Sequence, residues 1–217
     1  MKLMSTSFSR LGGAVLLIGA VLGIGVNLGL TIIPSDRPTT NPTVIALGWM
    51  DILVGLLIIL ALPTLVSRVA LGSRVLTVLG FAGLVMGFLA FSVSLGFERA
   101  VDGPYMVMHH TDLSAGPPRG GVLLIGGLAK IVGGVLFGIA AFRSNAVSRV
   151  AAVLIIAASV IFASGLIPHI PEPVDVLSGV MLLVGFGICG LQLLGVWAPV
   201  ASGTPTPQSD TRMGTAV

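Results

Sequence analysis

Six long apolar stretches constrain this chain more than any other feature of its sequence. Their boundaries are 11–33, 44–66, 75–97, 121–142, 150–167 and 177–197. About 20 helical residues are needed to cross the apolar core of a bilayer. Lipid offers no partner for an unpaired backbone group, so a spanning segment must be a helix or belong to a closed barrel. Runs such as LLIILAL at 56–62 do not alternate as barrel strands do. The sequence therefore predicts an all-α, polytopic membrane protein, a bundle of six transmembrane helices.

Composition excludes a soluble globular protein. Hydrophobic residues make up 55% of the 217 residues and charged residues only 9%, whereas soluble domains carry about 25% charged residues. Cys189 is the single cysteine, so an intramolecular disulfide framework is excluded. The net charge of +3 would suggest a nucleic-acid partner in a soluble protein, but in a membrane protein it only helps to orient the chain. No nucleic-acid partner is therefore predicted, and the lipid bilayer is the partner that the composition predicts.

The sequence divides into a membrane domain and a polar tail. Residues 1–197 form the predicted six-helix transmembrane domain, and residues 198–217 are a polar segment rich in Pro, Gly, Ser and Thr. Such a segment has little apolar surface to bury, so we predict a disordered cytoplasmic tail. The longest predicted connection is 98–120, which carries much of the polar chemistry of the chain.

The distribution of Lys and Arg predicts the orientation. Seven of these residues fall on the face that holds both termini, and three fall on the opposite face. Because Lys and Arg are enriched in cytoplasmic loops, both termini are predicted to be cytoplasmic. Nine Arg against two Lys, with abundant Ala, Gly and Val, suggests a bacterial protein. We therefore predict a multi-pass protein of the bacterial plasma membrane.

Polar residues inside the predicted spans mark the candidate site. Asn27, Asp51 and Lys130 lie about 9, 10 and 14 Å below the outer boundary, taking 1.5 Å per helical residue. Glycines flank all three at helical spacing, and small residues are typical of close helix contacts in membranes. These groups therefore point into the bundle. Ser94 ends a face of small residues on the third span and belongs to the same candidate cluster.

The cluster has two interpretations. A charge at mid-bilayer costs about 2.5–3.5 kcal/mol on insertion scales, and opposite charges relieve one another. We accordingly predict that Asp51 and Lys130 form a pair, with Asn27 on an adjoining face. The pair either locks the helices together or forms a site for an ion, a proton or a solute. Lys130 reaching outward to the membrane surface is the alternative to pairing.

The remaining chemistry-bearing residues give weak signals. His109, His110 and His169 all fall in predicted outer loops, near carboxylates, but their spacing matches no recognised metal site. No HExxH, GxSxG or phosphate-loop motif occurs in the sequence. No metal, cofactor or catalytic residue is therefore predicted, and the three histidines are only weak candidates for metal ligands.

Three functions remain compatible with these observations. The first is a non-enzymatic structural or accessory membrane protein, which associates with itself or another membrane protein through glycine-rich helix faces. The second is a small transporter or an ion- or proton-translocating protein that uses the polar cluster. The third is a membrane enzyme or cofactor protein that uses the extracytoplasmic histidines. The segment VLLIG occurs at 15–19 and at 122–126, as in an inverted repeat of two three-helix halves, although such short matches arise easily by chance.

Overall fold

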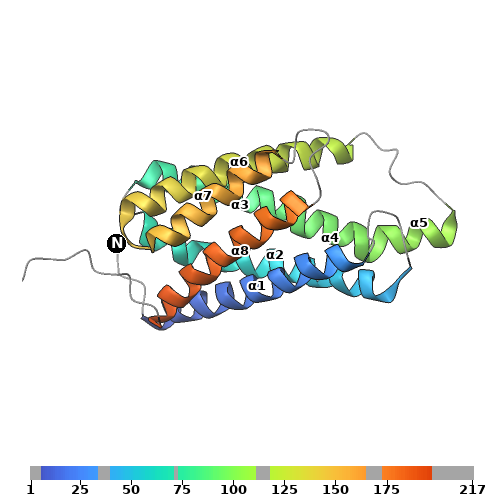
Figure 1. The fold of residues 1–217 in the computed structure, drawn as a ribbon, viewed down its shortest axis with the longest axis horizontal. Coiled ribbons are helices and arrows are strands. Elements are labelled where there is room, and N and C mark those ends of the chain that lie inside the picture. Colours follow the sequence, from blue (N-terminus) through green and yellow to red (C-terminus); the bar gives the residue numbers. More distant parts are fainter. Residues whose placement is uncertain (1–5, 34–39, 71–72, 111–117, 165–172, 197–217) are drawn as a thin grey trace, which may run out of the picture.

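The computed structural model describes residues 6–33, 40–70, 73–110, 118–164 and 173–196. Within these ranges the regular elements are all helices, and no strand occurs. The helices lie side by side along the long axis of the molecule and alternate in direction (Figure 1). Five of them are long and apolar enough to cross a membrane. The described residues therefore have the architecture of a multi-pass membrane protein.

Four long helices follow the predicted spans closely. Their bounds are α1 (Thr6–Ile32), α2 (Pro42–Val69), α6 (Pro118–Ser144) and α8 (Pro173–Leu194). The start of α2 shows why the boundary falls there: the side chain of Asn41 accepts a hydrogen bond from the Thr43 amide at 2.9 Å, and Pro42 occupies the first turn. Asn is a favoured helix cap, and proline is tolerated where no amide partner is needed.

The third span is longer than predicted. It runs without a break as α3 (Arg74–Phe88), η1 (Leu89–Ser94), α4 (Leu95–Phe97), η2 (Glu98–Asp102) and α5 (Gly103–His109). Its 36 residues measure about 54 Å at 1.5 Å per residue, against about 30 Å for the apolar core of a bilayer. The predicted loop over 98–120 is therefore wrong for residues 98–109. The charged residues at 98–102 are typical of a loop in water, but here they continue the helix, which no proline interrupts before α5.

The fifth predicted span is short in the described part of the chain. Helix α7 (Arg149–Ser164) has 16 residues, about 24 Å, and the last three residues of the predicted span 150–167 lie outside the described ranges. Length and composition identify five spanning helices, with α7 as a shorter apolar helix beside them.

Close backbone contacts hold the bundle together. Helix α1 packs against α2 and α8, α3 packs against α6, and α7 packs against α6 and α8. A Cβ atom added to Gly133 would lie 2.6 Å from the Gly83 carbonyl carbon, and one added to Gly190 would lie 2.8 Å from the Gly13 carbonyl oxygen. Only glycine permits such approaches, which is the packing mode expected of membrane helices.

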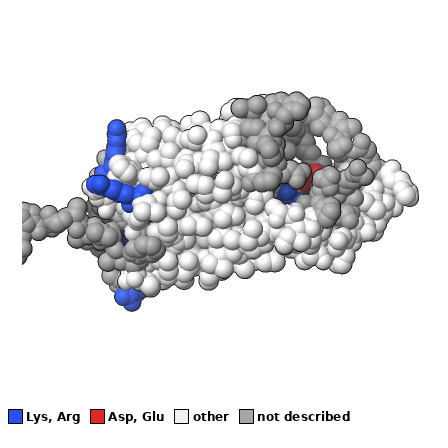
Figure 2. All heavy atoms as spheres, viewed as in Figure 1, with Lys and Arg blue, Asp and Glu red and all other residues white. Residues whose placement is uncertain are grey.

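The outer surface separates into an apolar belt and a basic end. Large apolar side chains such as Leu60, Val75 and Leu11 are 62–72% exposed along the helices, as suits a lipid-facing surface. Lys and Arg gather at one end of the molecule, opposite the end formed by α5 (Figure 2). Helix-terminal arginines at this end are Arg10, Arg68, Arg74, Arg143 and Arg149. The predicted tail 198–217 lies outside the described residues.

Candidate functional site

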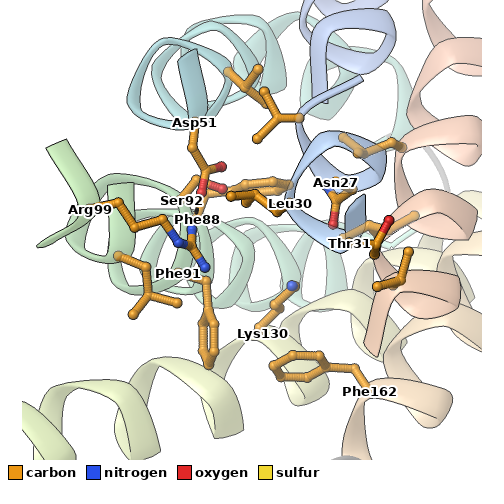
Figure 3. Close-up of a pocket in the computed structure, with 17 residues that line it drawn as sticks. Asn27, Leu30, Thr31, Asp51, Phe88, Phe91, Ser92, Arg99, Lys130 and Phe162 are labelled. Atoms are coloured by element: carbon orange, nitrogen blue, oxygen red, sulfur yellow. Dashed lines mark hydrogen bonds and ion pairs between the residues drawn. The ribbon is translucent and has the colours of Figure 1, made fainter. Parts of the chain in front are cut away.

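A cavity of about 630 Å³ opens among the helices toward the end opposite the arginines. It receives side chains from α1, α2, the long third helix, α6, α7 and α8 (Figure 3). Its polar and charged lining residues are Asn27, Thr31, Asp51, Ser92, Arg99 and Lys130. Three of the four residues of the predicted cluster thus face one space, although they come from three different helices.

The salt bridge of Asp51 is formed with Arg99, where the sequence predicted Lys130. Nη1 of Arg99 donates a hydrogen bond to Oδ2 of Asp51 at 3.1 Å. The two side chains are 24% and 14% exposed. The Ser92 hydroxyl shares the cavity wall with the carboxylate, and Lys130 attracts the carboxylate electrostatically. Asp51 therefore faces two cations rather than one.

Lys130 enters the cavity from α6 between two aromatic rings. Its Nζ lies 4.2 Å from the ring centroid of Phe162 and 5.2 Å from that of Phe91. The two rings are themselves in edge-to-face contact, with centroids 5.0 Å apart. Aromatic faces attract cations by about 0.5–2 kcal/mol, more as water is excluded. The lysine is thus held inside the cavity by its aromatic walls, as well as by its attraction to Asp51.

Paired glycines bring the salt bridge together. Gly48 lies three residues before Asp51 on α2, and Gly96 lies three residues before Arg99 on the third helix. A Cβ atom on Gly48 would lie 2.8 Å from the Gly96 carbonyl oxygen, and one on Gly96 would lie 2.7 Å from the Gly48 carbonyl oxygen. Residues three apart share a helix face. The two backbones therefore touch one turn away from the salt bridge.

Two π-helical turns direct the third helix toward the cavity. Ser92 and Phe91 lie on η1, and Arg99 lies on η2. Wide turns of this kind are rare in helices and are frequent at functional sites. No proline lies between residues 89 and 102, so the residue pattern carries no marker of these wide turns.

Asn27 forms the opposite wall. Its Nδ2 donates to the Gly23 carbonyl oxygen at 2.9 Å. Its Oδ1 faces α8, where a Cβ atom on Gly179 would come within 2.7 Å of it. The amide is therefore fixed by its own helix on one side and by a glycine of α8 on the other. Thr31, one turn further along α1, lines the same wall.

The remaining predicted residues lie elsewhere. Ser94 is on η1 but is not among the cavity-lining residues. His109 stacks on Tyr105 with ring centroids 4.1 Å apart, and His110 ends α5 in a left-handed conformation with φ of 51°. His169 lies outside the described residues. Within the described ranges, no group of three or more potential metal ligands comes together.

Sequence reasoning missed Arg99, Ser92 and the two phenylalanines. Arg99 falls in the predicted connection 98–120, beyond the predicted end of the third span at residue 97. A usable signal was the small-residue pair Gly96 and Ala100, four residues apart, which carries a helical spacing across the predicted end of the third span at residue 97. Comparisons with protein-family models, with curated proteins and with solved structures gave no match.

Proposed function

We propose that the protein binds a small solute inside its helix bundle, and that the cavity around Asp51, Arg99 and Lys130 is the binding site of a small transporter. In this proposal the chain crosses the bacterial plasma membrane six times, with α7 as the fifth span and with both termini in the cytoplasm. The arginine-rich end is then cytoplasmic, and the cavity lies in the outer half of the membrane.

The observation that carries the proposal is the combination of volume and charge. Ligand sites typically occupy about 300–1,000 Å³ and pair apolar walls with a few convergent polar groups, and the cavity of about 630 Å³ has both. It has room for about 20 water molecules at roughly 30 Å³ each. Ionisable residues within spanning segments usually line solute or ion pathways. A purely structural pair needs no such volume.

A structural role for the salt bridge is the second candidate. The contact of Gly48 with Gly96 lies one turn from the Asp51–Arg99 bridge, so the pair also fastens α2 to the third helix. In a structural or accessory protein this contact would be dry. The two functions therefore differ in whether water reaches the cavity.

Cysteine accessibility tests this difference. The single native cysteine, Cys189, is 1% exposed, so an introduced cysteine can be read without background. Ser92→Cys places a thiol on the cavity wall, and Leu89→Cys places one on the same helix where the side chain is 45% exposed on the apolar belt. Methanethiosulfonates react with the thiolate, which forms in water and not in lipid.

Intact cells would be treated with 2-hydroxyethyl methanethiosulfonate, added from outside. We expect Ser92→Cys to be labelled within minutes and Leu89→Cys to remain unlabelled. A membrane-impermeant charged analogue, added to cells and to inverted vesicles, reports the orientation, because the thiol should react faster from the outside. If Ser92→Cys is as inert as Leu89→Cys, the cavity is dry and the solute-binding proposal fails.

A further inference from the structure

Arginine is concentrated at the end of the bundle opposite the cavity opening (Figure 2). The described arginines of this end are exposed side chains close to helix ends, and we call them the arginine rim: Arg10, Arg68, Arg74, Arg143 and Arg149. Seven of the eight acidic residues of the full sequence belong to the cavity end, in its helices or in the connections joined to it. The eighth, Asp210, follows α8 and can neutralise one arginine at most. The rim therefore has a positive surplus when every acidic residue of the sequence is counted.

No acidic side chain of the described ranges lies close to the rim. Along a shared helix the nearest is Asp51, 17 residues before Arg68 on α2, which is about 26 Å at 1.5 Å per residue. That distance exceeds the screening length of about 8 Å at physiological salt. Arg68 instead donates from Nη2 to Oγ of Ser9 at 3.0 Å. The Arg149 guanidinium lies over the Phe142 ring, 5.6 Å from its centroid. Neither contact compensates a positive charge.

Helix stability does not explain where these arginines stand. Arg68 and Arg143 lie in the last turns of α2 and α6, where the helix dipole favours a cation. Arg74 and Arg149, however, are the first residues of α3 and α7. A positive charge at the start of a helix is opposed by the helix dipole. Half of the hairpin arginines are therefore placed against the preference of their own helices.

The rim lies where the apolar belt of the bundle ends. Arg10, Arg74 and Arg149 are each followed by a large apolar side chain that is 58–69% exposed. These neighbours are Leu11, Val75 and Val150. A long arginine side chain beside a lipid-facing residue extends its guanidinium to the level of the phospholipid headgroups. The guanidinium fork matches the oxygens of a phosphate group.

From this placement we infer that the arginine rim binds the phosphate groups of anionic phospholipids in the leaflet at that end of the bundle. In the orientation proposed above this is the cytoplasmic leaflet. An anionic lipid covers both parts of the surface, because its headgroup meets the guanidinium while its acyl chain meets the exposed apolar side chain. A soluble acidic partner would meet the charges alone. The inference concerns the outer surface and goes beyond solute binding in the cavity.

Two exposed positions of matched depth can report the lipids at the two ends. Val78 lies one turn after Arg74 on α3 and is 51% exposed, and Leu28 lies one turn before the end of α1 at the cavity end and is 49% exposed. The native Cys189 is buried, so a bimane fluorophore can be attached to Val78→Cys or to Leu28→Cys alone.

The labelled proteins would be placed in nanodiscs of equimolar phosphatidylglycerol and phosphatidylcholine. Only one of the two lipids carries bromine on its acyl chains in each preparation, and bromine quenches a fluorophore that it contacts. The ratio of the two quenching efficiencies gives the local preference for the anionic lipid. We expect a preference of about fivefold at Val78→Cys, the factor for one arginine beside an anionic surface, and no preference at Leu28→Cys.

Variants of single arginines test whether the preference is local. Arg74→Gln should bring the ratio at Val78→Cys close to one, and Arg74→Lys should keep most of it. Arg149→Gln is the matched control, because it removes the same charge from the same end but on α7, and α6 packs between α7 and α3. It should leave the ratio at Val78→Cys unchanged. Since Arg74 opposes the dipole of its own helix, Arg74→Gln is expected to fold, and quenching by brominated phosphatidylcholine confirms its insertion.

Three results would overturn the inference. The first is equal quenching by the two lipids at Val78→Cys, which would leave an acidic protein segment as the better partner for the rim. The second is an equal preference at Leu28→Cys, and the third is an equal loss in Arg149→Gln, because either would reflect the overall charge of the protein. Labelling of Ser92→Cys measures water in the cavity and involves no rim arginine, so a failure here is distinguishable from a failure of the solute-binding proposal.

Discussion

Replacing Gly96 by alanine should loosen the contact that positions the salt bridge. The new Cβ would lie 2.7 Å from the Gly48 carbonyl oxygen, whereas ordinary contacts begin at 3.4 Å. The backbones of α2 and the third helix would have to separate by about 0.7 Å on this arithmetic. Overpacking of this kind costs about 1–3 kcal/mol, and alanine returns about 1 kcal/mol of helix propensity.

Gly25→Ala is the matched control, because a Cβ atom there has no neighbour within 4 Å. Both variants gain the same helix propensity, so the difference between them isolates the overpacking cost of about 1–3 kcal/mol. Unfolding in mixed detergent micelles, with increasing dodecyl sulfate, would measure both free energies. Equal unfolding free energies for Gly96→Ala and Gly25→Ala would refute the close contact between the helices.

Three further predictions concern individual interactions. Asp51→Asn and Arg99→Met should each lower the unfolding free energy by about 2 kcal/mol, because each leaves a buried charge without its salt-bridge partner. The double variant should recover part of the loss, and strictly additive losses in the same assay would contradict this. Gln192→Met should lower the unfolding free energy by about 1 kcal/mol, since Oε1 of Gln192 accepts a hydrogen bond from the Ser148 amide at 2.9 Å at the start of α7. Gln192→Glu keeps an acceptor at this position and should lower the melting temperature less. Phe162→Leu removes the ring whose centroid lies 4.2 Å from Nζ of Lys130. It should lower the melting temperature by an amount equivalent to about 1 kcal/mol, and an unchanged melting temperature would argue against that contact.

Apolar runs predicted the helices well because a spanning segment must be long enough to cross the bilayer and must pair all of its backbone polar groups internally. The predicted span 44–66 lies within Pro42–Val69, and 121–142 lies within Pro118–Ser144. The partner of Asp51 was not predictable in the same way. Depth arithmetic assumed that each helix ends where its charges begin, but the third helix continues through Glu98 and carries Arg99 back toward α2.

The directions of the polar side chains could not be predicted from the spacing of residues in the sequence either. Two glycines near Asp51 and Lys130 indicate tight helix contacts, since Gly55 faces Ser92 and Gly87 faces Lys130. Which polar group meets which depends on helix rotation, and the π-helical turns change that rotation without a compositional signal. The depth of the polar groups was therefore easier to infer than their pairing.

The two π-helical turns also set a rotational phase along the third helix. Each wide turn closes its hydrogen bonds over one residue more than an α-helical turn does, and one residue corresponds to about 100° of rotation at 3.6 residues per turn. Loss of Val93 would leave every cavity-lining residue in the sequence but, if the wide turn were kept, would rotate Arg99 by about 100° away from α2. In this protein, residue count between Phe88 and Arg99 matters as much as residue identity, so insertions and deletions there should be tolerated less well than substitutions on the outer face.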